Sequence, residues 1–209
     1  MLRRHSPTEH PDSPCRRSPA TEQDSPANRT FLDHQEVAVL AAVQRRIAVP
    51  QVVSAARGLS HFGEHALGWL VLGAVGALID RRRRRDWLVS AAAVAAAHGA
   101  SIGVKRVVRR HRPTDPTVTA LAGTPSQLSF PSSHAASTTA AAILYGSLLR
   151  RRLVPVLVPP MLISRLVLGV HYPTDVLAGS ALGAAVGAGI RQWARGRRSF
   201  PGKGRRGRR

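Results

Sequence analysis

The chain has 209 residues, enough for one domain with tails, and its 31 Lys and Arg against 11 Asp and Glu give a formal net charge of +20. This charge favours anionic partners such as nucleic acid, anionic lipid or phosphorylated substrates, without choosing among them. Aromatic residues make up only 4% of the chain, which argues against a stacking platform for single-stranded nucleic acid, and the lone Cys15 excludes an intramolecular disulfide and a cysteine-based zinc site.

Both ends of the chain have the composition of tails. Residues 1–33 contain repeated Ser-Pro steps, mixed charges and few apolar side chains, which predicts disorder. Residues 194–209 are rich in Gly and Arg and show no apolar periodicity. A cationic tail of this kind is typical of a segment beside a membrane if spanning helices precede it.

An amphipathic segment follows the first tail. Residues 34–60 include the stretch "VAVLAAVQRRIAVPQVVSAARGL", whose apolar side chains are interrupted by Arg45, Arg46 and Pro50. These interruptions make a membrane span a poor interpretation. We expect instead a helix that lies at the membrane interface.

Five apolar runs, separated by charged residues, occupy residues 61–193. They cover residues 61–79, 87–104, 135–149, 153–170 and 176–190. Each is near the lower length limit for a helix that crosses a bilayer. Gly179, Gly183 and Gly187 recur every four residues on one face, which suits close helix packing in lipid. The pattern predicts an all-α integral membrane bundle of about five spanning helices plus the N-terminal interfacial helix.

A soluble helical bundle with buried Ala-rich helices is the alternative fold. It is disfavoured because several of the runs lack the polar face that a soluble helix keeps toward water. The membrane bundle is therefore the preferred prediction.

Basic residues are distributed unequally between the two ends of such a bundle. One end receives residues 81–85, residues 150–152 and the C-terminal tail, and the other receives residues 105–112 and Arg165. The first end is the more basic, so the positive-inside rule predicts that it is cytoplasmic. We expect a multi-pass plasma-membrane protein whose second end faces outward. Basic residues at that end go against the positive-inside rule, so they need another explanation.

Three segments at the outward end form a candidate phosphate site. They are "KRVVRRHRP" (105–113), "PSSH" (131–134) and "SRLVLGVHYPTD" (164–175). Phosphoryl transfer depends on fixed cations and N–H donors directed at the phosphoryl oxygens. Lys105, Arg112 and Arg165 supply three cations. Ser132 is the expected N-cap before Ser133, and the start of that helix favours an anion.

A nucleophile and a proton donor complete the expected chemistry. Asp175 lies four residues after His171, and Pro173 suits the first turn of the following helix. Asp175 could accept a hydrogen bond from one nitrogen of His171, which leaves the other free to attack phosphorus. His134 would protonate the leaving oxygen and then activate water to hydrolyse the phosphohistidine. Because the cations are side chains, we expect neither a metal ion nor another cofactor.

Each residue also has an ordinary explanation. Taken alone, Ser132 is most often a helix cap, His171 an interfacial polar residue and Arg165 a snorkelling arginine. Lys105 and the neighbouring arginines could be only a basic anchor for anionic lipid. Together, these separate explanations account for neither the spacing of the residues nor their shared end of the bundle.

The three segments resemble the signature of the type 2 phosphatidic acid phosphatase (PAP2) superfamily. That signature is Lys, six residues and Arg-Pro; then Pro-Ser-Gly-His; then Ser-Arg, five residues, His, three residues and Asp. The matching residues are Lys105, Arg112 and Pro113, then Pro131, Ser132 and His134, then Ser164, Arg165, His171 and Asp175. Ser133 replaces the glycine of the signature, which would strain the backbone only if that position needed a positive φ.

The resemblance implies a helical membrane phosphatase that forms a phosphohistidine. The implied roles are phosphate binding for Lys105, Arg112, Arg165, Ser132 and Ser133, nucleophile for His171, partner of the nucleophile for Asp175, and acid and base for His134. Vanadium haloperoxidases share the family's pocket, but they are larger soluble chains with few hydrophobic spans. The apolar runs therefore argue for the phosphatase.

Several functions remain open at this point. The preferred one is hydrolysis of a lipid phosphomonoester, either of the phosphatidic acid type or a polyprenyl-linked sugar phosphate such as decaprenylphosphoryl-5-phosphoribose. The second is suggested because the "SHFGEHALGWL" stretch and the Ala- and Arg-rich form are similar to actinobacterial members. A polyprenyl (undecaprenyl) diphosphate is an alternative substrate. A non-catalytic basic membrane protein that binds anionic lipid or nucleic acid is the alternative of another class, although no nucleic acid partner is expected.

Overall fold

The computed structural model describes residues 31–199, and their regular structure is helical. The helices are α1 (Phe31–Ile47), α2 (Pro50–Gly63), η3 (Glu64–Ala66), α3 (Leu67–Ile79), η4 (Arg81–Arg83), α4 (Arg84–Val108), α5 (Ser133–Leu149), α6 (Val154–Val167) and α7 (Pro173–Ser199), where η marks a 3₁₀ turn. Across these described residues, β-type pairing is limited to an isolated bridge between His111 and Leu128. The all-α prediction is confirmed.

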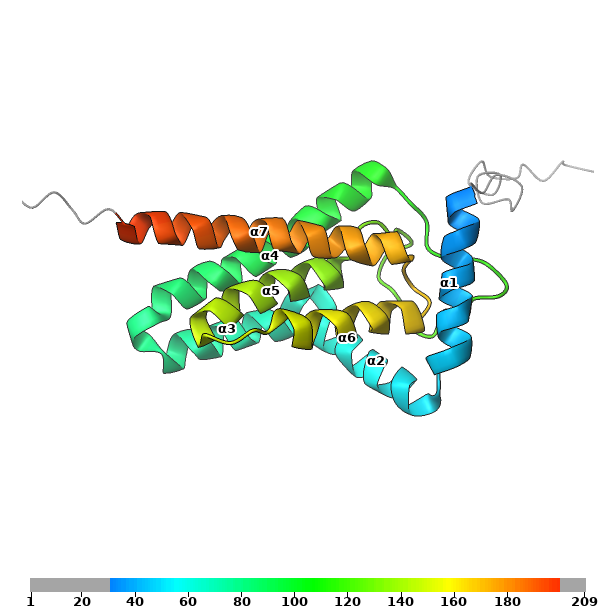
Figure 1. Cartoon of the computed structure of the whole chain (residues 1–209), viewed down its shortest axis with the longest axis horizontal. Helices are drawn as coiled ribbons and strands as arrows, with labels where there is room; N and C mark the ends of the chain where they lie inside the picture. Colours follow the sequence, from blue (N-terminus) through cyan, green and yellow to red (C-terminus); the bar gives the residue numbers. More distant parts are fainter. Residues whose placement is uncertain (1–30, 200–209) are drawn as a thin grey trace, which may run out of the picture. The chain divides into compact units, whose positions relative to one another are not determined.

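Helix α5 is the central helix of the compact unit that starts at Gln35. It packs against α4, α6 and α7, while α3 packs against α4 (Figure 1). Its first ten residues, "SHAASTTAAA", are small apart from His134, and all but His134 are buried. Small side chains on every face allow several neighbours to approach the same helix closely.

The glycines of α7 bring its backbone against that of α5. A Cβ at Gly183 would lie 2.2 Å from the carbonyl oxygen of Ala136, and a Cβ at Gly179 would lie 2.3 Å from that of Ser132. These distances leave no room for a side chain on this face of α7. The predicted close-packing face is therefore confirmed.

Aromatic side chains fill the space between α3, α4 and α5. Trp69, Trp87 and Tyr145 are buried in one cluster with several alanines. The indole N–H of Trp69 donates to Thr138 Oγ1 (3.1 Å), and the hydroxyl of Tyr145 donates to the carbonyl oxygen of Trp69 (2.8 Å). Because these polar atoms are paired, the rings contribute their apolar area to the core without leaving an unsatisfied group.

The helical segments long and apolar enough to cross a membrane are Pro50–Ile79 and Arg81–Val108. On α3, the side chains of Leu67, Val71 and Ile79 are 57%, 59% and 80% exposed. An exposed apolar surface of this kind suits contact with lipid. These features agree with a membrane protein, while the number of spanning helices stays a prediction.

The segment expected as a single interfacial helix, residues 34–60, is divided between two helices. Helix α1 ends at Ile47, and α2 begins at Pro50. Pro50 has no N–H to donate, and Val49 before it is extended (φ −76°, ψ 156°), so the first helix cannot continue through this point. Helix α2 then leads through η3 into α3. A location at the membrane interface stays a prediction.

The two predicted tails, residues 1–33 and 194–209, lie largely outside the described residues, as does Cys15. Where they are described, they are helical. Helix α1 begins at Phe31, and α7 continues to Ser199, beyond the expected boundary at residue 193.

We expect Gly183→Ala to destabilise the protein. The new methyl group would meet the carbonyl of Ala136, and its accommodation requires a shift of α7 against α5 that costs about 1–3 kcal/mol. Gly189→Ala in the same helix is the control, because a Cβ there meets nothing within 4 Å. Thermal unfolding in detergent should give a lower midpoint for Gly183→Ala than for the control. Equal midpoints would contradict the close packing.

Candidate active site

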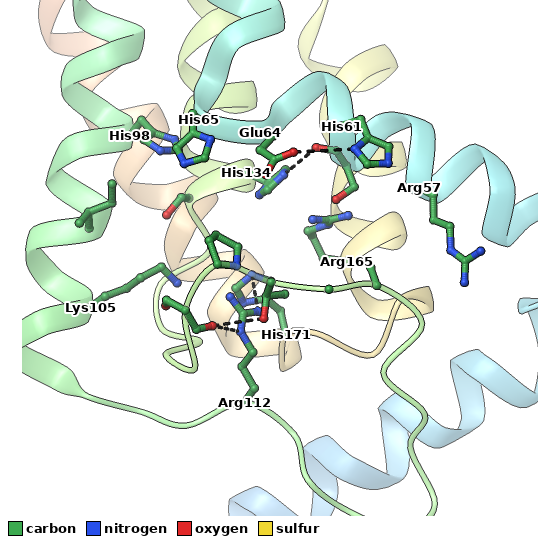
Figure 2. Close-up of a pocket in the computed structure, with 18 of the residues that line it drawn as sticks. Arg57, His61, Glu64, His65, His98, Lys105, Arg112, His134, Arg165 and His171 are labelled. Atoms are coloured by element: carbon green, nitrogen blue, oxygen red, sulfur yellow. Dashed lines mark hydrogen bonds and ion pairs between the residues drawn. The ribbon is translucent and has the colours of Figure 1, made fainter.

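A cavity of about 600 Å³ opens where α4 and α6 end and α5 and α7 begin (Figure 2). Six of the eight predicted site residues line it, namely Lys105, Arg112, Ser133, His134, Arg165 and His171. The other two, Ser132 and Asp175, have no exposed surface. The three motif segments, which are distant in the chain, therefore meet at one cavity.

The "PSSH" segment forms the start of α5. Ser132 is the N-cap, and its Oγ accepts a hydrogen bond from the N–H of Ala135 (3.4 Å). The N–H of Ser132 itself donates to the carbonyl oxygen of Asp175 (2.9 Å), which joins the starts of α5 and α7. Ser133 is the first helical residue, so it has an ordinary helical backbone and accepts a hydrogen bond from Ser101 (2.6 Å). The expected cap is confirmed, and the serine in place of glycine causes no strain.

Two of the cations are fixed by backbone carbonyls. Lys105, near the end of α4, donates from Nζ to the carbonyl oxygens of Leu128 (3.2 Å) and Ser129 (2.9 Å). Arg112, in the loop that follows α4, donates from Nη1 to the carbonyl oxygen of Val170 (2.5 Å). Neutral carbonyls orient these side chains and leave their positive charge available to an anion.

Arg165 brings unpaired donors to the same cavity from the last turn of α6. Its side chain is only 2% exposed, and its Nε and Nη2 make no hydrogen bond within residues 31–199. A buried guanidinium without partners is costly unless an anion pairs with it. The position of Arg165 therefore supports an anion-binding site.

His171 lies between Asp175 and Arg112. Its Nδ1 is 3.5 Å from Asp175 Oδ2, and its Nε2 is 3.4 Å from Arg112 Nη1. Nδ1 makes no hydrogen bond within residues 31–199, so the structure places Asp175 beside His171 without the expected hydrogen bond. Burial, followed by the charges of Arg112, Lys105 and Arg165, lowers the pKa of this imidazole well below 6.5. The ring is thus unprotonated at neutral pH, as a nucleophile must be. Burial lowers the pKa of Arg112 to about 10, so the guanidinium stays charged.

A network of charged residues holds Asp175 from the side away from the cavity. Arg110 Nη1 donates to Asp175 Oδ1 (3.1 Å), and the N–H of Tyr172 donates to Asp175 Oδ2 (2.8 Å). The Arg110 guanidinium also lies 4.0 Å from the centre of the Tyr172 ring and pairs with Glu36 of α1. Glu36 in turn accepts from the N–H (2.8 Å) and the hydroxyl (2.6 Å) of Thr174 in the first turn of α7.

The sequence pattern does not reveal this network. Arg110 reads as part of a basic lipid anchor and Glu36 as part of an interfacial helix, and the two are 74 residues apart. The one available signal is that Arg110 lies between the motif residues Lys105 and Arg112. That signal does not say which acidic residue the arginine meets.

Helix α2 and the 3₁₀ turn η3 provide a further wall that the motifs do not predict. Arg57, His61, Glu64 and His65 all line the cavity, and Nε2 of His134 donates to the carbonyl oxygen of Ser60 (3.0 Å). No trio of His, Cys, Asp or Glu side chains in the described part of the chain is placed to hold a metal ion. What converges here is a set of cations around two imidazoles, an arrangement that suits phosphoryl transfer to nitrogen.

Comparisons with known proteins identify the family. The family model for the PAP2 superfamily matches residues 86–199. Decaprenylphosphoryl-5-phosphoribose phosphatase from Mycobacterium tuberculosis is 56% identical over 154 residues, which cover 73% of this chain and 87% of that protein. The chain belongs to the PAP2 superfamily. It is a phosphatase, and the resemblance of its three motifs to this family is confirmed.

Two further similarities extend the comparison of this PAP2 protein. The phosphatase of the same name from Mycolicibacterium smegmatis is 55% identical over 145 residues, which cover 69% of this chain and 81% of that protein. A solved structure, the transmembrane PAP2 type phosphatidylglycerolphosphate phosphatase from Bacillus subtilis, matches with a TM-score of 0.68. The match covers 85% of this chain and 90% of that one, and its 22% identity supports a shared fold only. The alternative of a non-catalytic basic protein is not supported.

We expect Arg110→Gln to lower turnover. The substitution removes a charge-assisted hydrogen bond to Asp175, a kind of bond worth about 1.5–3 kcal/mol, so a loss of about 10- to 100-fold is expected. Initial rates on a lipid phosphate should show the loss mainly in kcat, because Arg110 does not line the cavity. Arg106→Gln, at an exposed position of α4, is the control and should keep wild-type turnover. Equal turnover of the two variants would show that Arg110 does not support catalysis.

Proposed function

We propose that this PAP2 protein removes the phosphomonoester of a polyprenyl-linked sugar phosphate, with decaprenylphosphoryl-5-phosphoribose as its substrate. The observation that carries this proposal is the 56% identity to a phosphatase of that name over 87% of its length. The cavity of about 600 Å³ supports it, because this volume admits a sugar as well as a phosphate group. Phosphatidic acid and a polyprenyl diphosphate are the competing substrates.

In the first half of the proposed reaction, the phosphomonoester binds between Lys105, Arg112 and Arg165. These cations stabilise the negative charge on the phosphoryl oxygens in the transition state. Nε2 of His171 attacks phosphorus, and the bond to the ester oxygen breaks with its electrons on that oxygen. Asp175 keeps the proton on Nδ1 of His171 and stabilises the positive charge of the phosphohistidine.

His134 supplies and recovers the proton. Its Nε2–H is engaged by the carbonyl of Ser60. Burial, followed by the charge of Arg165, lowers the pKa of His134 to about 3 in the empty site. The bound phosphate dianion raises this pKa, and the doubly protonated ring then presents Nδ1–H to the departing ester oxygen. In the second half, Nδ1 takes a proton from water while the water oxygen attacks phosphorus. The bond between phosphorus and His171 breaks, which releases inorganic phosphate and restores both histidines.

We also infer a multi-pass topology with the cavity on the extracytoplasmic face of the plasma membrane. The arginines of η4 and Arg150 lie at the ends of α4 and α5 that are opposite to the cavity (Figure 1). Their concentration at that end supports a cytoplasmic location for it. The head group would then enter from the outer leaflet.

A substrate panel tests the proposed function. Purified full-length protein should show the highest kcat/KM on decaprenylphosphoryl-5-phosphoribose, with lower values on phosphatidic acid and undecaprenyl diphosphate. Activity should persist in a chelator, because the cations that hold phosphate are side chains. His171→Ala should abolish release of phosphate, whereas His111→Ala, at an exposed position outside the cavity, should not. A preference for either competing lipid would contradict the substrate assignment.

A further inference from the structure

Helix α2 and the turn η3 carry polar side chains that the proposed reaction does not use. The candidate span Pro50–Ile79 contains four ionisable residues, and all four line the active-site cavity. They are Arg57, His61, Glu64 and His65. Ionisable side chains are costly in an apolar helix and usually serve a function where they occur. Their common position on one cavity wall therefore points to a ligand.

The four side chains share one side of α2 and of the turn that follows it. Arg57, His61 and Glu64 are separated by four and three residues, which places them on the same face of a helix. His65 has a left-handed backbone (φ 49°), and its ring centre lies 6.3 Å from that of His98 on α4. In Figure 2 the histidines and Glu64 lie along the edge of the cavity opposite the predicted nucleophile.

Two of the lining residues have polar atoms available to a ligand. Nε of Arg57 donates to the carbonyl oxygen of Leu121 (2.9 Å), which holds the side chain against the loop between α4 and α5. The terminal nitrogens of Arg57 make no hydrogen bond or ion pair with the residues that the structure describes. On α4, the buried Nδ1 of His98 is likewise without a partner among those residues. These atoms suit a polar ligand larger than one phosphate group.

We propose that this wall is a second anion subsite, in which the guanidinium of Arg57 binds the phosphodiester of the substrate. Decaprenylphosphoryl-5-phosphoribose carries a phosphomonoester and a phosphodiester on one ribose, so a site for it must hold two anions. The three cations near His171 match the doubly charged monoester. A planar guanidinium matches the two free oxygens of a singly charged diester. The ribose between the two phosphates then faces His61, Glu64 and His98.

The proposal rests on the proposed substrate and sharpens it. A lipid monophosphate without the sugar has no second phosphate to place on α2. The wall would therefore act as a specificity element that favours a substrate with a phosphodiester, while the motif residues act on any phosphomonoester. Hydrolysis of the phosphomonoester and selection of the substrate would thus depend on residues of different helices.

Arg57→Gln tests the subsite with two substrates that share the same ribose 5-phosphate and the same polyprenyl chain. One has the natural phosphodiester, and the other has an uncharged ether in its place. We expect Arg57→Gln to lower kcat/KM on the diester about 10- to 100-fold, mainly through KM, and on the ether less than about twofold. Arg57→Lys should recover part of the loss. Arg46→Gln, at an exposed position outside the cavity, is the control.

Binding of the dephosphorylated product, decaprenylphosphoryl-ribose, separates this proposal from the proposed function. Arg57→Gln should weaken the Kd of the product about 10-fold or more relative to wild type. If wild type binds the product in this Arg57-dependent way but does not cleave the substrate, the subsite stands and the proposed function fails. If wild type cleaves the substrate but Arg57→Gln binds the product equally well, or loses activity equally on the diester and the ether, the subsite is overturned. Absence of both binding and cleavage would overturn both.

Discussion

The close contact between α5 and α7 determines where the chemistry of this protein lies. Because Gly179 and Gly183 admit the backbone of α5, the two helices begin beside one another, and the N–H of Ser132 reaches the carbonyl oxygen of Asp175. That hydrogen bond joins the segment of the proposed acid to the segment of the proposed nucleophile. The same small residues that make a dense helical core therefore set the distance between the two imidazoles.

Cations behind the site are neutralised by acidic side chains, whereas the cations that face the cavity are not. This difference makes the cavity suitable for phosphate. Behind the site, acidic groups are paired with a cation: Arg110 forms one ion pair with Asp175 and another with Glu36. The cations that face the cavity are instead held by neutral carbonyls or, for Arg165, carry unpaired donors. Positive charge therefore remains for the substrate, and together with burial, the larger cause, it keeps the proposed nucleophile unprotonated.

The motif residues could be predicted because their chemistry is encoded locally. Residue type and spacing identify the cations and His171, and alternating helix ends bring the three segments together. The contact between Glu36 and Arg110 could not be predicted, because it depends on how α1 meets the start of α7. The role of α2 as a cavity wall was missed for the same reason. Pro50 did carry a local signal, and it marks the point where the expected single helix divides.

Transfer of phosphate through His171 is the central claim of this account. Full-length protein is mixed with substrate labelled in its phosphomonoester, quenched at alkaline pH within one turnover, digested and mapped by mass spectrometry. The account predicts a phosphoryl group on the peptide that contains His171, with a longer lifetime in His134→Gln because activation of water is slowed. Turnover with no phosphoryl group on the protein, or with the group on another residue, would contradict it.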